Sequence, residues 1–530
     1  MPRLALLSVS DKTGLVEFAK SLHQDLNFEI VSSGGTAKAI SAAGIPVTKV
    51  SDYTGSPEIL GGRVKTLHPK VHGGILARPD QTADQQDLKD NDIRPFDLVV
   101  VNLYPFEQTI AKPNVTLADA IENIDIGGPT MIRSAAKNHK YLTVLCSPQQ
   151  YNDYLDAAKA NDSQPSMAFR AACAQQAFWH TANYDCAIAQ YLTQTQSSTT
   201  DTSKTDTSKT DISKAAPTSY AISGTLKQTL RYGENPHQPA GWYQSGAVPT
   251  GWAAAEQLQG KALSYNNLVD LEAARRIIAE FPSEDQPAAA VLKHTNPCGV
   301  SLGDSLATAY QQAFNADNIS AFGGIVALNR PIDEATANAL TGTFLECVVA
   351  PGCSEGAKAI LSKKKNLRIL VLPDLVSGPK QTVRAIAGGF LSQASDDLRE
   401  DPSQWIIPTE LKPNDAQLTE MLFAWRVVKH VKSNAILVAK NNTTLGVGAG
   451  QMNRVGAVKI ALEQAGEQTK GATLASDGFF PFDDSVRTAA AAGIKAIVQP
   501  GGSIRDEDSI KAANELGIIM AFTSVRHFLH

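Results

Sequence analysis

The chain of 530 residues is 43% hydrophobic and 19% charged, a composition typical of globular proteins. Its 38 glycines and 27 prolines are an average share, which excludes a collagen-like or wholly disordered chain. The 48 basic and 53 acidic residues give a net charge of −5, so we expect neither nucleic acid nor a membrane surface as a partner.

The start of the chain is expected to form a buried strand. Residues 1–10 (MPRLALLSVS) have too short an apolar run for a signal peptide and no small-residue cleavage site. No run anywhere approaches the roughly 18 apolar residues of a transmembrane helix. The six cysteines are sparse and form no C-x-x-C pair, so a disulfide framework is not expected. These features predict a cytoplasmic enzyme with reduced thiols.

One segment differs in composition from the rest of the chain. Residues 200–214 read TDTSK-TDTSK-TDISK, a neutral polar repeat with almost nothing to bury. Such a segment is typical of a flexible linker. We therefore expect an N-terminal domain over residues 1–195, a linker over 196–217 and a C-terminal domain over 218–530.

The N-terminal part alternates strand-like and helix-like runs, which predicts an α/β fold with a parallel sheet flanked by helices. The expected strands are Leu4–Ser8, Glu29–Ser32, Leu98–Leu103 and Leu142–Cys146, and the expected helices are Thr13–Leu22 and Thr36–Ala43.

Two polar, glycine-containing loops follow the first two strands and open helices. They are residues 8–14 (SVSDKTG) and 33–36 (SGGT). Backbone N–H groups at a helix start attract phosphate, and Lys12 would add a charge-assisted bond. Either loop alone is more often a simple helix cap. Two in succession favour a phosphorylated small molecule, although the P-loop spacing is absent.

Residues 61–74 (GGRVKTLHPKVHGG) place basic side chains between two glycine pairs. His68 and His72 have a spacing that could suit zinc. Pro69 is expected to interrupt a helix there, and the glutamate of H-E-x-x-H is missing. The segment is better interpreted as an anion-binding loop.

Three further clusters complete the N-terminal part: residues 102–106 (NLYPF), a tight loop over 124–129 (IDIGGP), and a short helix over 133–139 (RSAAKNH). A loop carboxylate, a tyrosine and several lysines could transfer protons if they converge. Spacing alone does not establish that convergence.

The C-terminal part also alternates and is large enough for two sub-domains, although its halves show no clear sequence repeat. The expected strands are Ala288–Leu292, Gly324–Leu328, Leu367–Leu372 and Ala435–Ala439. Lys293 and His294 directly follow the first of these strands, where charge is unfavourable to bury. Histidine suits general base catalysis and lysine can stabilise an oxyanion, while a structural polar cap is the alternative.

Two partial motifs in this part are rejected. Pro297-Cys298 begins a zinc-deaminase pattern, but Ser301 replaces the second cysteine and no H-x-E precedes it. Residues 446–451 (GVGAGQ) miss the third glycine of a dinucleotide fingerprint. Residues 479–482 (FFPF) could stack on a flat ring, although such aromatics are more often core.

Taken together, nine motifs resemble one known family. SVSDKTG, GGRVKTLHPKVHGG, NLYPF, IDIGGP, AAKNH, RYGENPHQ, KHTNPCG, GVGAGQ and SDGFFPF occur in the order found in the bifunctional AICAR transformylase/IMP cyclohydrolases of purine biosynthesis. The resemblance covers the whole chain except the TDTSK linker. It implies a methylglyoxal-synthase-like N-terminal domain and a C-terminal domain of two cytidine-deaminase-like α/β halves.

The resemblance also implies the chemistry. The C-terminal domain would transfer a formyl group from 10-formyltetrahydrofolate to the amine of AICAR, and the N-terminal domain would close formyl-AICAR to IMP with release of water. By similarity His294 is the general base, Lys293 supports the transition state or the leaving nitrogen, and Asn434 orients the pair.

The other implied C-terminal residues fall into two sets. AICAR would be held by Arg231, Tyr232, Gly323, Glu346 and Arg526. Some members of the family carry aspartate where this chain has Glu346. The folate region would include Arg454, Phe479, Asp484, Ser503 and Ile504.

In the N-terminal domain the resemblance implies that Lys137 transfers the proton, assisted by Tyr104, Asp125 and Lys65. The nucleotide and its phosphate would be bound by Ser10, Asp11, Lys12, Ser33, Gly34, Gly35, Thr36, Arg63, Val64, Thr66 and Asn102.

The resemblance further implies a homodimer acting on AICAR, formyl-AICAR, IMP and folate, with no catalytic metal and no tightly bound cofactor. A structural potassium ion occurs in parts of the family. Two alternatives stay open from the sequence: a nucleotide sensor that uses the same loops, and an enzyme that retains one activity only.

Overall fold

The structure is a computed structural model that describes residues 2–161, 164–198, 217–284 and 286–530. It forms two compact units. Unit 1 comprises the chain up to Thr225 together with Gln244–Val248, and unit 2 comprises Leu226–Tyr243 together with Pro249–His530. Most of the expected linker, residues 199–216, lies outside the described residues. Every helix within the described ranges is too short or too polar to span a bilayer.

Unit 1 is built on a five-stranded sheet in which every pairing is parallel, as the alternation predicts. The strand order is β3-β2-β1-β4-β5. The strands are β1 (Arg3–Val9), β2 (Phe28–Ser32), β3 (Thr48–Lys49), β4 (Leu98–Asn102) and β5 (Thr143–Leu145).

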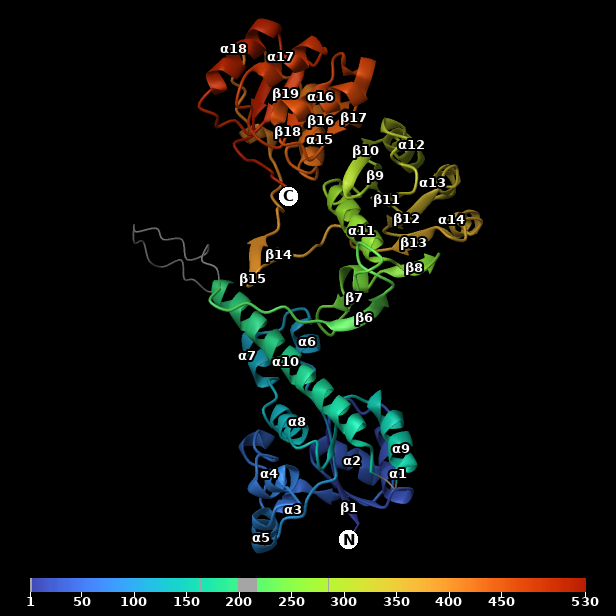
Figure 1. The fold of residues 1–530 in the computed structure, drawn as a ribbon, viewed down its shortest axis with the longest axis vertical. Coiled ribbons are helices and arrows are strands. Elements are labelled where there is room, and N and C mark those ends of the chain that lie inside the picture. Colours follow the sequence, from blue (N-terminus) through green and yellow to red (C-terminus); the bar gives the residue numbers. More distant parts are fainter. Residues whose placement is uncertain (1, 162–163, 199–216, 285) are drawn as a thin grey trace, which may run out of the picture. The chain divides into compact units, whose positions relative to one another are not determined.

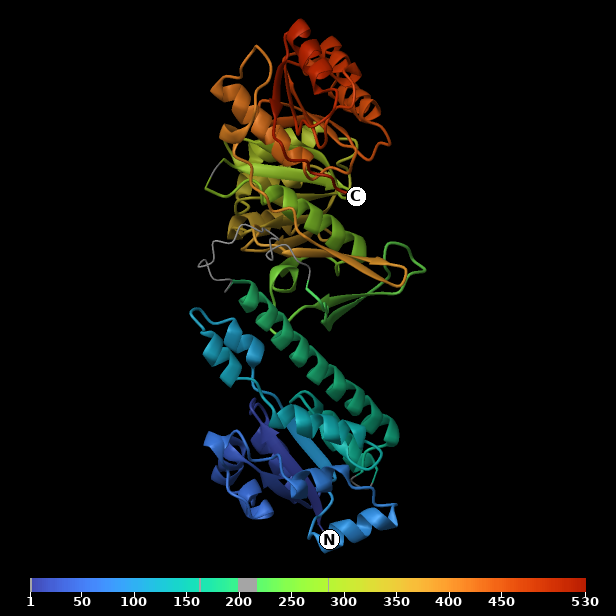
Figure 2. The same ribbon diagram turned by 90° about the vertical axis from the view of Figure 1, so that its left-hand side faces the viewer.

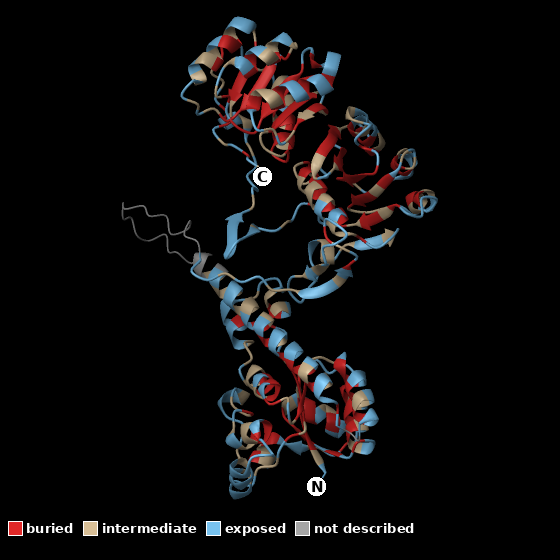
Figure 3. Ribbon diagram, in the orientation of Figure 1, coloured by how far each residue is buried: buried red, intermediate tan, exposed pale blue. Residues whose placement is uncertain are grey.

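Alternate side chains of each central strand face two separate apolar layers. In β4, Val99 and Val101 pack into one buried cluster, and Leu98 and Val100 into the other. A parallel sheet that is covered on both faces explains the continuous apolar run of this strand. Figure 3 shows the sheet buried beneath helices whose outer faces are exposed.

Most helices of unit 1 pack against these two layers, as Figure 1 shows, whereas α5 and η1 have no buried residue. Figure 2 shows α10 as one long continuous helix. The helical segments are α1 (Leu15–Gln24), α2 (Gly34–Ala42), α3 (Val50–Thr54), η1 (Leu60–Gly62), α4 (Pro69–Leu76), α5 (Thr82–Asp90), α6 (Phe106–Ile110), α7 (Leu117–Glu122), α8 (Gly127–Lys137), α9 (Gln150–Ala160) and α10 (Met167–Ser198).

Two local predictions in unit 1 are wrong. The expected loop over residues 124–129 contains the start of α8, which begins at Gly127 and includes Pro129. Proline is tolerated in a first helical turn because its missing N–H has no partner there anyway. For the same reason Pro69 begins α4 and does not interrupt a helix.

Unit 2 is built on an eleven-stranded mixed sheet of order β20-β19-β18-β16-β17-β10-β9-β11-β12-β13-β8. The strands are β8 (Glu256–Gln259), β9 (Ala288–Lys293), β10 (Asn296–Leu302), β11 (Gly324–Leu328), β12 (Leu345–Ala350), β13 (Arg368–Val371), β16 (Ile436–Lys440), β17 (Thr443–Gly448), β18 (Thr473–Ser476), β19 (Ala496–Gln499) and β20 (Ile519–Phe522). Two hairpins lie outside this sheet: β6 (Thr225–Leu230) with β7 (Ala240–Gln244), and β14 (Gln381–Ile386) with β15 (Gly389–Ala394).

The sheet contains a structural repeat. Each half runs helix, β-hairpin, and then three helix–strand pairs. The first half contains α11 (Tyr265–Ile278), β9, β10, α12 (Leu306–Ala316), β11, α13 (Glu334–Leu340), β12, α14 (Glu355–Leu361) and β13. The second half contains α15 (Asp415–Val428), β16, β17, α16 (Arg454–Ala465), β18, α17 (Asp484–Ala491), β19, α18 (Asp506–Leu516) and β20. The two halves meet where β10 pairs with β17. The expectation of two α/β halves is thus met, although no repeat was visible in the sequence.

The two faces of this sheet are covered differently. The first helix of each half, α11 and α15, contributes to a single apolar cluster that spans both halves. The remaining helices form one cluster per half on the opposite face. The halves therefore share one layer of core and each keep one of their own.

The glycines of the rejected dinucleotide motif have a packing role. A Cβ on Gly446 would lie 2.0 Å from the Ala461 carbonyl oxygen, and one on Gly448 would lie 2.0 Å from that of Ala457. Strand β17 therefore approaches the backbone of α16 more closely than any residue with a side chain allows. The same holds in the first half, where a Cβ on Gly299 would lie 2.1 Å from the Ala313 carbonyl oxygen.

Candidate active sites

In unit 1 the loops at the carboxyl ends of the strands are bonded to one another. The Asn102 side-chain oxygen accepts N–H groups from Ser10 (2.6 Å) and Asp11 (2.9 Å). The Thr36 hydroxyl accepts the Val9 N–H and donates to the Val9 carbonyl, at 3.0 Å each. The ends of β1, β2 and β4 thus form one edge, where open α/β sheets bind ligands.

Two lysines lie at the start of α2 on this edge. A Cβ on Gly34 would lie 3.7 Å from Lys65 Nζ, and one on Gly35 would lie 3.7 Å from Lys12 Nζ. Gly34 has a φ of +51°, which favours glycine. The free N–H groups of the helix start and two ammonium groups together make an anion site.

Asp125 lies beside this anion site. Its carboxylate accepts the Gly128 N–H at 2.9 Å. Burial raises the pKa of Asp125, although hydrogen bonds from the backbone of Gly128 and Tyr104 and the charge of Lys65 act against that rise. A carboxyl group, a lysine and the Tyr104 backbone therefore converge, as proton transfer requires. Thr66 is also near, because a Cβ on Gly127 would lie 2.7 Å from its hydroxyl oxygen.

Three other predicted residues lie apart from this cluster. Lys137 is exposed at the last turn of α8, whereas Asp125 bonds to the first turn. Ten residues of helix separate the two ends by about 15 Å. Arg63 lies 3.8 Å from Glu122 in an exposed ion pair, and Val64 bridges to Ile59.

Unit 2 contains a cavity of about 770 Å³, here called the first cavity. Six residues predicted from the sequence line it: Arg231, Tyr232, Lys293, His294, Gly323 and Glu346. They come from segments more than one hundred residues apart, and the fold brings them together.

His294 and Thr295 form the two-residue turn between β9 and β10, here called the His294 turn, because Lys293 pairs with Asn296. Both turn residues have positive φ, +50° and +64°. Such turns suit Asn and Gly, and a β-branched threonine is a conformational outlier. Lys293 Nζ donates to the carbonyls of Phe322 and Gly323 at 3.0 Å each, which leaves one of its three N–H bonds free.

Two residues of α11 that sequence reasoning missed also line the first cavity. Asn267 is 3% exposed and donates to Glu346 Oε2 at 2.8 Å. Asp270 accepts the Thr295 N–H at 2.8 Å. Arg368 lies 3.9 Å from Glu346. The available signal was the capping box between Ser264 and Asn267, which fixes the start of α11, together with the one-turn spacing to Asp270.

Comparisons with known proteins identify the family of the chain. Residues 14–130 match the MGS-like domain, and residues 135–464 match the AICARFT/IMPCHase bienzyme. The bifunctional purine biosynthesis protein PurH of Nostoc punctiforme is 66% identical over 530 residues and covers 100% of both chains. PurH of Synechococcus elongatus is 65% identical with the same coverage. The chain belongs to the AICARFT/IMPCHase bienzyme family. Among solved structures, one described as "Crystal structure of ForH" is 35% identical, covers 36% of this chain and 98% of that chain, and has a TM-score of 0.33.

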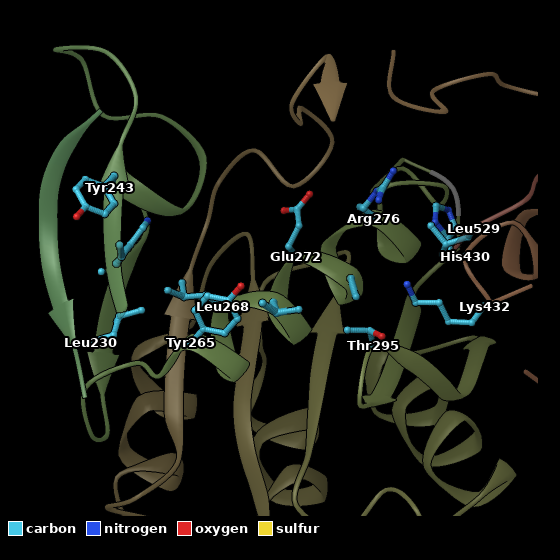
Figure 4. Close-up of a pocket in the computed structure, with 14 residues that line it drawn as sticks. Leu230, Tyr243, Tyr265, Leu268, Glu272, Arg276, Thr295, His430, Lys432 and Leu529 are labelled. Carbon is cyan, nitrogen blue, oxygen red and sulfur yellow. The ribbon is translucent and has the colours of Figure 1, made fainter. Parts of the chain in front are cut away.

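The bienzyme has a second cavity, of about 460 Å³, beside the first. Thr295 lines it, whereas His294 lines the first cavity. Figure 4 shows Thr295 close to Lys432, with Arg276 and His430 at the same end and Tyr243 at the other. Burial and the charges of Arg384 and Arg276 lower the pKa of Lys432. The His294 turn therefore lies between two cavities of the bienzyme.

Asn434 lies near the His294 turn in the bienzyme. Two residues before it, the Lys432 N–H donates to Asn296 Oδ1 at 3.2 Å, directly after the turn. Asn434 itself bonds through its side chain to the Gln451 carbonyl at 2.9 Å.

The remaining predicted residues lie in the second half of unit 2 and do not line either cavity. Arg454 is buried and forms an ion pair with the fully buried Asp477. The other residues are partly or fully exposed: Phe479, Asp484, Ser503, Ile504 and Arg526. Ile504 is fully exposed, and the Arg526 guanidinium lies 4.7 Å from the Phe528 ring centroid.

Metal-ligating side chains do not cluster in the part of the bienzyme that the structure describes, where no group of three or more His, Cys, Asp or Glu could hold an ion. His68 has both ring nitrogens engaged: Nδ1 accepts the Lys70 N–H at 3.1 Å, and Nε2 lies 3.2 Å from Ser56 Oγ.

Proposed function

We propose that the two activities of the bienzyme are divided between its two units. As a member of its family, the chain is a bifunctional enzyme that catalyses the last two steps of IMP synthesis, first as an AICAR formyltransferase and then as an IMP cyclohydrolase. We assign formyl transfer to the first cavity of unit 2 and ring closure to the strand-end site of unit 1. The observation that carries the first assignment is the Lys293–His294 pair on a turn that lines a cavity of substrate size.

Formyl transfer joins the 5-amino nitrogen of AICAR to the formyl carbon of 10-formyltetrahydrofolate. This amine is a weak nucleophile because its lone pair is delocalised into the imidazole ring. Removal of its proton during the attack is therefore valuable, and we assign His294 as the acceptor of that proton. The N10 nitrogen of folate leaves with a proton, so tetrahydrofolate and formyl-AICAR are the products. The free N–H of Lys293 would stabilise negative charge on the formyl oxygen.

The first cavity also offers groups for holding AICAR. Arg231 would meet the phosphate, and Tyr232 would lie against the base or ribose. Glu346 is held by Asn267 at 2.8 Å, so its carboxylate is fixed in direction and can accept from the carboxamide or ribose. These three roles are assigned on residue chemistry and on a shared position in one cavity.

In unit 1 we place the nucleotide phosphate at the start of α2, between Lys12 and Lys65. Ser10, Asp11, Ser33, Thr36, Thr66 and Asn102 belong to the loops around it. Ring closure joins the carboxamide nitrogen to the formyl carbon and expels water. Asp125, Tyr104 and Lys65 would move the protons of that step.

A homodimer would complete both sites. Lys137 lies about 15 Å from the helix end that holds Asp125, so it would serve the site of a second chain. The same arrangement would bring the second-half residues of unit 2 to a partner's first cavity. Those residues are Arg454, Phe479, Asp484, Ser503, Ile504 and Arg526. A cytoplasmic location and a structural potassium ion belong to the same proposal through family resemblance alone.

The division of labour is tested with two variants of the full chain. His294→Ala should lose formyl transfer, followed as tetrahydrofolate release, and should still convert supplied formyl-AICAR to IMP. Lys137→Ala should give the opposite result. Loss of both activities in either variant, in a protein of normal melting temperature, would contradict the division.

The shared unit 1 site is tested by mixing two inactive variants, Asp125→Asn and Lys137→Ala. If each site uses Lys137 from the partner, half of the mixed population forms heterodimers with one intact site. We expect about a quarter of the wild-type cyclisation rate to return. No recovery after confirmed subunit exchange would place Lys137 in the same chain as Asp125.

A further inference from the structure

Asp270 is bonded to the turn that carries the proposed base. It lies on α11 and lines the first cavity together with His294. Its Oδ1 accepts the Thr295 N–H at 2.8 Å. Thr295 has a φ of +64° and His294 a φ of +50°, so the bond is made to a backbone in an unfavourable conformation. A turn of this kind persists only when its surroundings hold it.

The second half of unit 2 contains a counterpart of this arrangement. Glu420 occupies the same place on α15 as Asp270 on α11, six residues after the helix N-cap (Asn414 and Ser264). Burial raises the pKa of Glu420, and a backbone hydrogen bond from Asn441 acts against that rise. Asn441 begins the matching two-residue turn between β16 and β17. A carboxylate that holds a turn is therefore a feature of the repeat.

The turns of the two halves differ in their side chains. The first turn carries an imidazole that borders a large cavity, whereas the second turn carries two asparagines. A fixed negative charge near an imidazole changes how readily the imidazole holds a proton, and it has no such effect on an amide.

We propose that Asp270 is a positioning residue for formyl transfer, which holds the His294 turn in place and keeps a negative charge in the cavity that His294 lines. The proposal rests on the proposed role of His294 as base. Asp270 acts through the turn and through the electrostatic field of the cavity, with no assigned contact to the reacting atoms.

The electrostatic part of this role can be followed from the charges around Asp270. Its carboxylate interacts favourably with His294 and Lys293 and unfavourably with Glu346. Burial raises the pKa of Asp270, and the Thr295 hydrogen bond and the interactions with His294 and Lys293 oppose that rise. The other ionisable groups that line the first cavity are Arg231, Tyr232, Lys261 and Arg368. Asp270 belongs to α11, and its carboxylate bonds directly to the His294 turn.

The test separates geometry from charge. Asp270→Asn keeps an oxygen that can accept the Thr295 N–H but removes the negative charge, so protonated His294 loses stabilisation. The acid limb of the pH profile of kcat for formyl transfer should move to lower pH by on the order of one unit. Asp270→Ala removes the acceptor as well, and kcat should fall by about 10²-fold.

Glu420→Gln is the matched control, because it removes the equivalent charge beside a turn without an imidazole. It should leave the pH profile of formyl transfer unchanged. Melting temperatures of all three variants report any general loss of stability. A profile of Asp270→Asn that superimposes on that of the wild type, or an equal shift in Glu420→Gln, would overturn the proposal.

The result is distinguishable from failure of the proposed function. If His294→Ala retains formyl transfer, the base assignment is wrong whatever Asp270 does. If His294→Ala is inactive and Asp270→Asn keeps the wild-type profile, only the role of Asp270 is rejected. Cyclisation of supplied formyl-AICAR should be unaffected in every variant and confirms that unit 1 is intact.

Discussion

The two β-hairpins of unit 2 share a frame but carry different turns. In each, a lysine ends the first strand and donates to backbone just before the strand that follows the hairpin. Lys293 donates to the Phe322 and Gly323 carbonyls before β11, and Lys440 donates to the Lys470 carbonyl before β18 at 2.8 Å. In each, both turn residues have positive φ. The first turn reads His-Thr and the second Asn-Asn.

This difference separates what the fold requires from what the chemistry requires. Asparagine adopts positive φ with little strain, so the Asn441 turn (Asn441–Asn442) follows the rule for such hairpins. Histidine and threonine at the same two positions break the rule, and a local violation of this kind is characteristic of functional sites. The lysine is common to both halves and does not distinguish them, whereas the imidazole of His294 does.

The largest expected effect comes from making the first turn resemble the second. His294→Asn keeps a side chain suited to the turn and removes the imidazole. Formyl transfer should fall by about 10²–10⁴-fold because the proton acceptor is lost. The measurement is tetrahydrofolate release with AICAR at saturation, and Asn441→His in an otherwise unchanged chain is the control, which should keep normal activity. A fall of less than tenfold in His294→Asn would show that the turn sequence does not carry the chemistry.

A smaller effect is expected from the close strand–helix contacts that both halves share. Gly299 and Gly446 hold matching positions, and a Cβ at either would lie within 2.1 Å of a helix carbonyl oxygen. Gly299→Ala and Gly446→Ala should each lower the free energy of unfolding by roughly 1–3 kcal/mol, because the helix must shift outward. Urea unfolding checks the two values. A marked inequality between them would mean that the halves are less alike in packing than their backbones indicate.

Variants of the two matching lysines, Lys293 and Lys440, should differ in activity and not in stability. Lys293→Met and Lys440→Met each remove hydrogen bonds to carbonyls, so each should destabilise the protein by about 1 kcal/mol. Only Lys293→Met should slow formyl transfer. Thermal unfolding and a formyl-transfer assay on both variants provide the comparison, and equal losses of activity would argue against a special role for Lys293.

The smallest effect is expected from relief of strain in the first turn. Thr295 is β-branched and has a φ of +64°. Thr295→Asn replaces it with asparagine, the residue found at the matching position, Asn442. The free energy of unfolding should rise by about 1 kcal/mol. An unchanged or lowered stability would show that the Thr295 hydroxyl, which donates to the His294 carbonyl at 2.7 Å, offsets the strain.

Much of the fold follows from the sequence because the central strands are continuous apolar runs. Leu98–Leu103 and Gly324–Leu328 were predicted within one residue of β4 and β11. The two-residue strand β3 has no such run and was not predicted. The structural repeat of unit 2 was also missed. Its two halves share the order of their elements and a few matching residues, such as Lys293 and Lys440, and these produce no periodic pattern in the sequence.

The candidate sites show the same limit. The rule that ligands bind at strand ends indicated the loops of unit 1, and the charge directly after an apolar strand indicated the Lys293–His294 pair. Asp270 was missed because its role depends on contact with a residue 25 positions away, which helix periodicity does not encode. The resemblance implied a role for Lys137, but its distance from Asp125 along α8 became visible only with the helix in place.

The junction of β10 and β17 determines how small a part of unit 2 can stay in solution. A chain cut between the halves would expose one of these strands as an unpaired edge with free backbone N–H and carbonyl groups. It would also uncover half of the apolar layer beneath α11 and α15. Edges of that kind recruit other chains into aggregates. Truncations of the gene that end inside either half should therefore yield insoluble protein, and the whole of unit 2 is the smallest fragment worth expressing.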